Sequence, residues 1–148
     1  MQHEDKRTTG AVPLIELIPD ISLLSVRCAA TALFLFSGVI KAVFWDGALQ
    51  EFAALKLGLL PLIGTIVVQC VGAALLLAGI YPRSAALLLA GFTLMATVIA
   101  HPVWPLTPSF DQQQTTVFLE HMVIVASLLV ISAHGGGRFS LFKSASRP

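Results

Sequence analysis

The apolar positions of this chain fall into four long runs separated by short, more polar stretches. The runs are Ile21–Phe44, Leu59–Ile80, Arg83–Val103 and Thr115–His134. The first run offers ~35 Å of α-helix at ~1.5 Å per residue, enough to cross a hydrocarbon core ~30 Å thick. Because a backbone in lipid must satisfy its own hydrogen bonds, each run is predicted to form a helix.

Proline and glycine mark the ends of the predicted helices. Pro61 lies in the first turn of the second run, where its missing N–H costs nothing, and Gly79 ends that run. The third run begins directly after Tyr81 and Pro82, so the second and third helices should form an antiparallel hairpin. The four runs therefore predict an all-α fold, an integral membrane antiparallel four-helix bundle.

Small residues predict where these helices touch, because lipid gives apolar side chains no drive to associate. We expect contacts at the pairs Ala74/Ala78 and Ala86/Ala90, and at Gly38, Gly72 and Gly91.

Composition supports a membrane protein and excludes some partners. Of 148 residues, 56% are hydrophobic and only 11% are charged, against roughly 25% charged in soluble domains. A net charge of +1 without long basic runs gives no reason to expect nucleic acid. The tail 1–12 mixes acidic and basic residues and does not resemble a cleaved signal. Pro13 and Pro19 are expected to break up the segment that follows, and Val12–Ile18, too short to span, is expected at the interface. We divide the chain into a tail and interfacial segment 1–20, a membrane domain 21–142 and a tail 143–148.

The distribution of lysine and arginine predicts the orientation. Six such residues fall on the side of the chain termini and two on the other side. The six are Lys6, Arg7, Arg83, Arg138, Lys143 and Arg147, and the two are Lys41 and Lys56. The excess of positive charge places both termini of the multi-pass chain in the cytoplasm. Trp45 and Trp104 then lie at the outer interface, which indole rings favour.

Ionisable residues inside the membrane are expensive, so each is a candidate for a site. Arg27 and Lys41 are about four turns apart and share one face of the first helix. Arg27 lies only ~9 Å inside the predicted boundary, by rise per residue. It can therefore either snorkel to water or make a buried polar contact.

Several polar residues meet near the outer boundary of the predicted bundle. One hypothesis is a polar pocket formed by Lys41, His101, Glu120 and His121, next to Trp45, in which Glu120 pairs with Lys41 and the histidines exchange protons. The alternative is that each side chain simply reaches interfacial water. Glu120 and His121 point ~100° apart on a helix, so at most one is central. No i, i+4 pair suggests a metal site, and no catalytic residue is assigned.

Two further features concern residues inside the membrane. The amide of Gln69 should bond to a neighbouring helix, with Arg27 or Thr97 as its partner. Cys28 and Cys70 are interpreted as small apolar side chains or, alternatively, as a redox pair, since helix rise places them within ~5 Å in depth.

The chain resembles the DoxX family of small four-helix membrane proteins. The resemblance covers about residues 21–142 and is carried by Phe36–Lys41, Gly72–Gly79, Arg83–Ala86, His101–Trp104 and Gly135–Leu141. Two positions depart from the family pattern. Relatives usually carry glutamate where Gln69 stands and commonly asparagine where His121 stands, so a proton relay through position 69 is in doubt here.

The resemblance implies a protein of the bacterial cell inner membrane that is linked to a quinone, because the family is named for a subunit of a thiosulfate:quinone oxidoreductase and some members are linked to redox-stress complexes. The first hypothesis is a membrane subunit of such a quinone-linked system. The sequence has no haem, flavin or iron–sulfur motif, so electrons would come from a redox partner subunit. The alternatives are a scaffold or anchor without chemistry, alone or as a homo-oligomer, and, ranked last, a small-molecule carrier.

Overall fold

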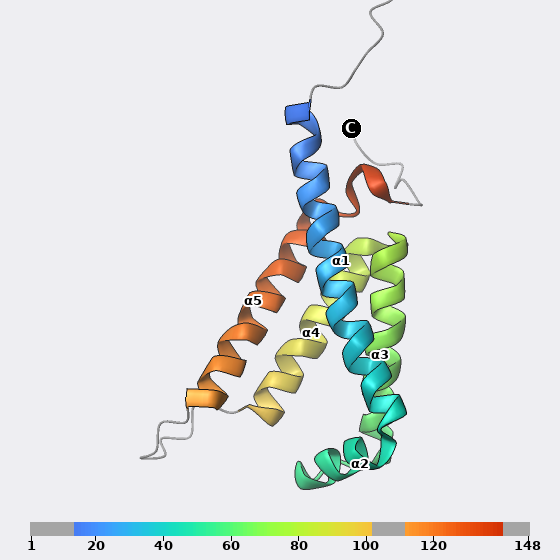
Figure 1. Ribbon diagram of the computed structural model, residues 1–148, viewed down its shortest axis with the longest axis vertical. Coiled ribbons are helices and arrows are strands. Elements are labelled where there is room, and N and C mark those ends of the chain that lie inside the picture. Colours follow the sequence, from blue (N-terminus) through green and yellow to red (C-terminus); the bar gives the residue numbers. More distant parts are fainter. Residues whose placement is uncertain (1–13, 102–111, 141–148) are drawn as a thin grey trace, which may run out of the picture.

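The computed structural model describes residues 14–101 and 112–140. It contains four helices long and apolar enough to cross a membrane: α1 (Leu14–Val43), α3 (Leu59–Ala78), α4 (Pro82–Ala100) and α5 (Gln112–His134). A shorter helix, α2 (Trp45–Ala54), follows α1, and a 3-10 turn, η1 (Gly137–Phe139), follows α5 (Figure 1). The prediction of an all-α membrane bundle is confirmed. The tails 1–12 and 143–148 and Trp104 lie outside the described residues.

Helix α1 begins at Leu14 rather than at Ile21, so the break expected at Pro19 does not occur. Pro19 lies inside the helix. Because proline has no N–H, only one backbone carbonyl, one turn earlier, is left without its helical hydrogen bond. This part of α1 projects beyond the other helices (Figure 1), and Ile18 and Pro19 are exposed. The cost of the proline is therefore small at this position.

Helix α2 is an element that the sequence analysis did not predict. It is too short to span a membrane, and it buries Ala48 and Phe52, four residues apart, against Leu62 of α3. The carboxylate of Asp46 lies in the first turn of α2, where it interacts favourably with the positive end of the helix dipole. The residues between the first two spans thus form an amphipathic helix across one end of the bundle.

The predicted hairpin of the second and third spans is present. Helix α3 ends in a Schellman motif, in which the amides of Gly79 and Ile80 bond to the carbonyls of Leu76 and Leu75. Gly79 has a φ of 68°, a conformation that glycine adopts without strain. Tyr81 and Pro82 then start α4 at once.

The four spans pack as two pairs. Helix α1 lies along α3, α4 lies along α5, and the pairs join mainly where α3 meets α4. In Figure 1 the pairs diverge toward the end of the bundle that carries α2, which we call the α2 end. The opposite end, with the Tyr81 turn, the start of α1 and η1, is the terminal end.

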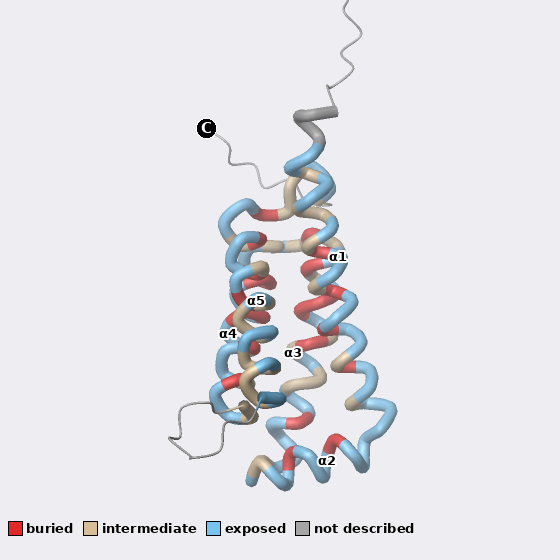
Figure 2. Tube along the Cα trace, turned by 60° about the vertical axis from the view of Figure 1, so that its left-hand side comes forward, coloured by how far each residue is buried: buried red, intermediate tan, exposed pale blue. Residues whose placement is uncertain are grey.

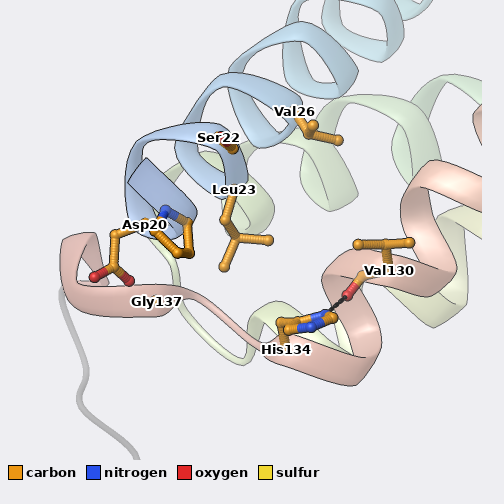
Figure 3. Close-up of a pocket in the computed structure, with 8 residues that line it drawn as sticks. Asp20, Ser22, Leu23, Val26, Val130, His134 and Gly137 are labelled. Carbon is orange, nitrogen blue, oxygen red and sulfur yellow. Dashed lines mark hydrogen bonds between the residues drawn. The ribbon is translucent and has the colours of Figure 1, made fainter. Parts of the chain in front are cut away.

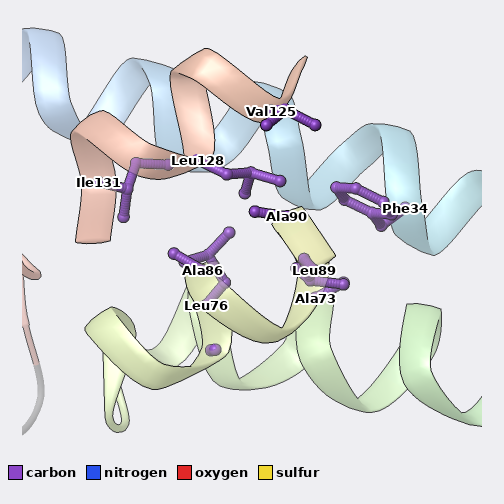
Figure 4. Packing of buried hydrophobic residues seen from close by; sticks show 10 residues of the cluster. Phe34, Ala73, Leu76, Ala86, Leu89, Ala90, Val125, Leu128 and Ile131 are labelled. Atoms are coloured by element: carbon purple, nitrogen blue, oxygen red, sulfur yellow. The ribbon is translucent and has the colours of Figure 1, made fainter. Parts of the chain in front are cut away.

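The shared apolar core occupies the half of the bundle nearer the terminal end (Figures 2 and 4). Its buried members are Phe34, Ala73, Leu76, Ala85, Ala86, Leu89, Ala90, Val125, Leu128 and Ile131. Among the described residues, the buried positions of α4 beyond Ala90 are Thr93 and Thr97, and α5 has no buried residue before Val125. Toward the α2 end, no buried apolar side chain among the described residues joins the two pairs.

Small residues mediate helix contact at most, but not all, of the predicted positions. An added Cβ at Gly38 would lie 2.7 Å from Cys70 Sγ, so only glycine allows α1 and α3 to approach as closely as they do. Ala86 and Ala90 are buried as expected. The prediction is wrong for Ala74, which is exposed because α3 buries Gly72, Ala73 and Leu76 instead. It is also wrong for Gly91, which has open space around it.

Candidate functional site

Arg27 is completely buried and bonds to backbone carbonyls at the terminal end. Its Nε and Nη2 donate to the carbonyl of Leu76 at 3.2 and 2.9 Å, and Nη2 also donates to Leu77 at 3.0 Å. Nη1 donates to Gly136 at 2.6 Å and to Phe139 at 3.3 Å. The guanidinium therefore connects α1, the end of α3 and the segment after α5.

This arrangement decides between the two interpretations of Arg27. The side chain makes buried contacts and does not snorkel. Its five bonds use all five guanidinium N–H groups. The carbonyl end of α3 carries the negative end of a helix dipole, which stabilises the buried charge. With its donors occupied, Arg27 is a structural residue rather than a ligand-binding one.

Ser37, Lys41 and Gln69 form a polar cluster between α1 and α3, which we call the Ser37 cluster. Lys41 Nζ donates to Ser37 Oγ at 3.0 Å, and Gln69 Nε2 donates to the same oxygen at 3.1 Å. Gln69 is only 6% exposed, and its Oε1 has no hydrogen-bond partner. The predicted partners of Gln69, Arg27 and Thr97, are therefore wrong. All N–H donors of Arg27 are already bonded to carbonyls at the terminal end, and the hydroxyl of Ser37 lies within hydrogen-bonding distance of the Gln69 amide.

Thr97, His101, Gln114 and His121 form a second polar cluster between α4 and α5, which we call the histidine cluster. The rings of His101 and His121 meet edge to face with centroids 5.3 Å apart. Thr97 Oγ1 lies 2.9 Å from His121 Nδ1, and His101 Nδ1 lies 2.8 Å from Gln114 Oε1. Thr97 is buried and the two imidazoles are partly buried.

The structure thus divides the predicted outer pocket into separate clusters. It brings His101 and His121 together, whereas Lys41 belongs to the other helix pair. Among the described residues, no ion pair joins Lys41 to Glu120, because Glu120 lies on the exposed side of α5 and Lys41 bonds to Ser37. Trp45, at the start of α2, is 37% exposed. A single pocket holding all five residues is therefore not formed by direct contacts.

Two residues of these clusters were missed by the sequence analysis. Ser37 stands one helical turn before Lys41, a spacing that places both on one face and could have indicated their contact. Gln114 stands in a polar stretch just before the predicted start of the fourth helix. The helix in fact begins at Gln112, which aligns Gln114 with His101.

The two cysteines are free thiols and are not close to each other. Cys70 packs against Gly38, ten residues beyond Cys28 along α1, or ~15 Å at 1.5 Å per residue. The expectation of equal depth is wrong because α3 is displaced along α1 relative to the simple count. Cys28 is exposed on the outer side of α1.

A pocket of about 290 Å³ lies at the terminal end, away from both polar clusters (Figure 3). Leu23, Val26 and Val130 give it an apolar floor, and its lining includes Asp20 and His134. Asp20 accepts a hydrogen bond from the backbone N–H of Arg138 at 3.1 Å. His134 Nδ1 lies 2.9 Å from the carbonyl of Val130. Both polar groups therefore have partners within the protein, and none of the predicted site residues lies here.

Comparison with known proteins supports the fold. The inner membrane protein YphA of Escherichia coli (strain K12) is 28% identical over 123 residues, which cover 82% of this chain and 88% of the relative. No solved structure matches the chain. The family model DoxX matches residues 22–102, more than half of the chain and a range that runs from α1 through α4. The chain therefore belongs to the DoxX family.

Proposed function

We propose that this chain is the membrane subunit of a quinone-linked redox system. It lies in the bacterial inner membrane with both termini in the cytoplasm. The location is supported by the similarity to an inner membrane protein of Escherichia coli. The orientation is supported by the excess of lysine and arginine at the terminal end, where Arg83 and Arg138 lie.

The observation that carries the proposal is the His101–His121 pair. Paired imidazoles within a hydrophobic bundle are costly unless they bind something polar, since each leaves ring nitrogens to be satisfied. Here each ring has a fixed partner at Nδ1, Thr97 or Gln114, which orients the ring. Such an oriented pair suits the oxygen of a ligand that enters from the membrane.

The surroundings of the pair suit a quinone, which combines a flat apolar ring with polar oxygen atoms. Toward the α2 end the two helix pairs share no buried apolar side chain among the described residues. A ring could therefore enter between them without displacing a packed core. The Ser37 cluster lies on the other helix pair, where Lys41 supplies a positive charge. Electrons would reach this site from a partner subunit, as the sequence carries no cofactor motif of its own.

The test is direct binding by the purified full-length protein in lipid nanodiscs. We expect a co-purified quinone in the organic extract, detected by mass spectrometry, and saturable binding of a decyl-substituted benzoquinone or of the corresponding hydroquinone, its reduced form. His101→Ala should weaken binding of the hydroquinone at least about tenfold through loss of one oriented hydrogen bond. Lys56→Ala, which removes an exposed cation outside both clusters, should leave binding unchanged. An empty extract together with no saturable binding by the wild-type protein would refute the proposal.

A scaffold without chemistry is the second candidate, favoured by helix α5. Only 17% of its span is buried, the lowest share of the four spans. Glu120 is exposed on this surface and has no ion pair among the described residues. A cationic partner helix would satisfy it. If Glu120→Gln abolishes co-purification of a partner while quinone binding is absent in the wild-type protein, the scaffold is the better description.

A further inference from the structure

Resting on the proposed function, we infer that the histidine cluster selects the reduced form of its ligand, a hydroquinone, over the oxidised quinone. A quinone carbonyl only accepts hydrogen bonds, whereas a hydroquinone hydroxyl donates one. The hydrogen bonds of Thr97 and Gln114 fix which ring nitrogens of His101 and His121 carry protons, and so decide which form fits.

The tautomer of His121 follows from the single proton of the Thr97 hydroxyl. Thr97 Oγ1 donates that proton to the carbonyl of Thr93 at 2.7 Å, one turn earlier in α4. Its contact with His121 Nδ1 at 2.9 Å must then run the other way, with the imidazole as donor. Neutral His121 therefore carries its proton on Nδ1, and Nε2 has a bare lone pair.

The same reasoning applies to His101. Its Nδ1 lies 2.8 Å from Gln114 Oε1, a carbonyl oxygen that can only accept. Neutral His101 therefore also carries its proton on Nδ1 and offers the lone pair of Nε2. Among the described residues, no hydrogen bond engages either Nε2 atom.

A third acceptor without a partner lies on the facing helix pair. Gln69 Oε1 is buried and unpaired, while the amide nitrogen of the same side chain donates to Ser37. An unpaired buried acceptor costs about 1–3 kcal/mol, which a donor from a ligand would recover. Like the two imidazole lone pairs, this oxygen accepts a hydrogen bond from a hydroxyl group and not from a quinone carbonyl.

The test compares the two redox forms on the same protein. Full-length protein in nanodiscs is titrated anaerobically with the decyl-substituted hydroquinone and with the corresponding benzoquinone. We expect the hydroquinone to bind at least about tenfold more tightly, the value of one hydrogen bond. In parallel, ¹⁵N NMR of histidine-labelled protein, assigned with single histidine variants, should show protonated Nδ1 and bare Nε2 at positions 101 and 121.

Variants of Thr97 test whether the tautomer of His121, and not only the position of its ring, sets the preference for hydroquinone. Thr97→Val keeps the shape but removes the oxygen that holds the proton on Nδ1, so His121 can exchange tautomers and the preference for hydroquinone should shrink several-fold. Thr97→Ser should restore it. His134→Gln, at the terminal end, should bind both forms as the wild-type protein does.

Each outcome is decisive. Equal binding of the two forms, or tighter binding of the quinone, would overturn the inference and leave the proposed function standing. A proton on Nε2 in the NMR spectrum would also overturn it, independently of any titration. If neither form binds, the proposed function fails and the inference fails with it.

Discussion

Arg27 shows how a single charged residue can be stable in the interior of a membrane bundle. Its guanidinium is fully buried and every N–H donates to a carbonyl oxygen. The carbonyls come from the last turn of α3 and from the turn after α5, and the ends of helices leave such groups without intrahelical partners. The charge thus satisfies acceptors that would otherwise be unpaired, at a place that water does not reach.

We predict that Arg27→Lys destabilises the protein by about 3 kcal/mol or more. Lysine has three N–H donors instead of five, so at least two of the five hydrogen bonds from the charged group to buried carbonyls are lost, each worth about 1.5–3 kcal/mol. Thermal unfolding in detergent micelles measures the loss. Arg83→Lys is the matched control, because Arg83 is exposed at the same end of the bundle and should unfold as the wild-type protein does. Equal stability of the two variants would contradict the saturated geometry.

At this scale the sequence indicated which residues matter but not which partners they have. Arg27, Lys41, Gln69 and the two histidines were identified by the cost of polarity in lipid. Their partners depend on helix register and on sub-ångström approach. Gln69 bonds to Ser37, and not to Arg27 or Thr97, because Gly38 lets α1 lie directly against α3.

At the scale of the helices, the close packing of α1 against α3 depends on the absence of a side chain at Gly38. An added Cβ at Gly38 would lie 2.7 Å from Cys70 Sγ and 3.2 Å from Gln69 Cβ. We predict that Gly38→Ala destabilises the protein by about 1–3 kcal/mol through overpacking. Thermal unfolding in micelles again provides the measurement. The double variant Gly38→Ala, Cys70→Ala should recover part of the loss, because it removes the sulfur from the contact.

Gly91 provides the matched control for this prediction. It also lies within a membrane helix, but an added Cβ there meets nothing within 4 Å. Gly91→Ala should be neutral or stabilising by up to about 1 kcal/mol, since alanine favours a helix. If both alanine variants lower the unfolding temperature equally, crowding at Gly38 is not the cause.

The elements themselves were largely predictable because the hydrophobic runs are long and proline and glycine mark their ends. Helix α2 was not predicted, since its ten residues hold no long apolar run and only the spacing of Ala48 and Phe52 reveals its buried face. The early start of α1 was also missed. The proline at position 19 indicates a break, yet near an exposed helix end the backbone tolerates it.

For the whole molecule, the arrangement predicts that α2 and the Tyr81 turn lie on opposite sides of the membrane. With Cys28 and Cys70 replaced by alanine, we expect a membrane-impermeant maleimide to label Gln50→Cys from the periplasm. Ser84→Cys should react only after the inner membrane is opened. Both positions are exposed, on α2 and at the start of α4. The reversed pattern would overturn the proposed orientation, and labelling of both positions from one side would contradict a spanning bundle.

The contacts of Arg27 impose an order on biosynthesis. Its first partner, Leu76, follows 49 residues later in the chain, and Gly136 follows 109 residues later. A guanidinium without acceptors is unstable in hydrocarbon, so the first span cannot settle at its final depth until the second span has been made and inserted. The contact with Gly136 and Phe139 forms last, after translation of the fourth span. In nascent chains stopped before residue 136, Arg27 should therefore hold the first two spans together through Leu76, but its bonds to Gly136 and Phe139 cannot form. Such truncated products would be preferred substrates for membrane proteases.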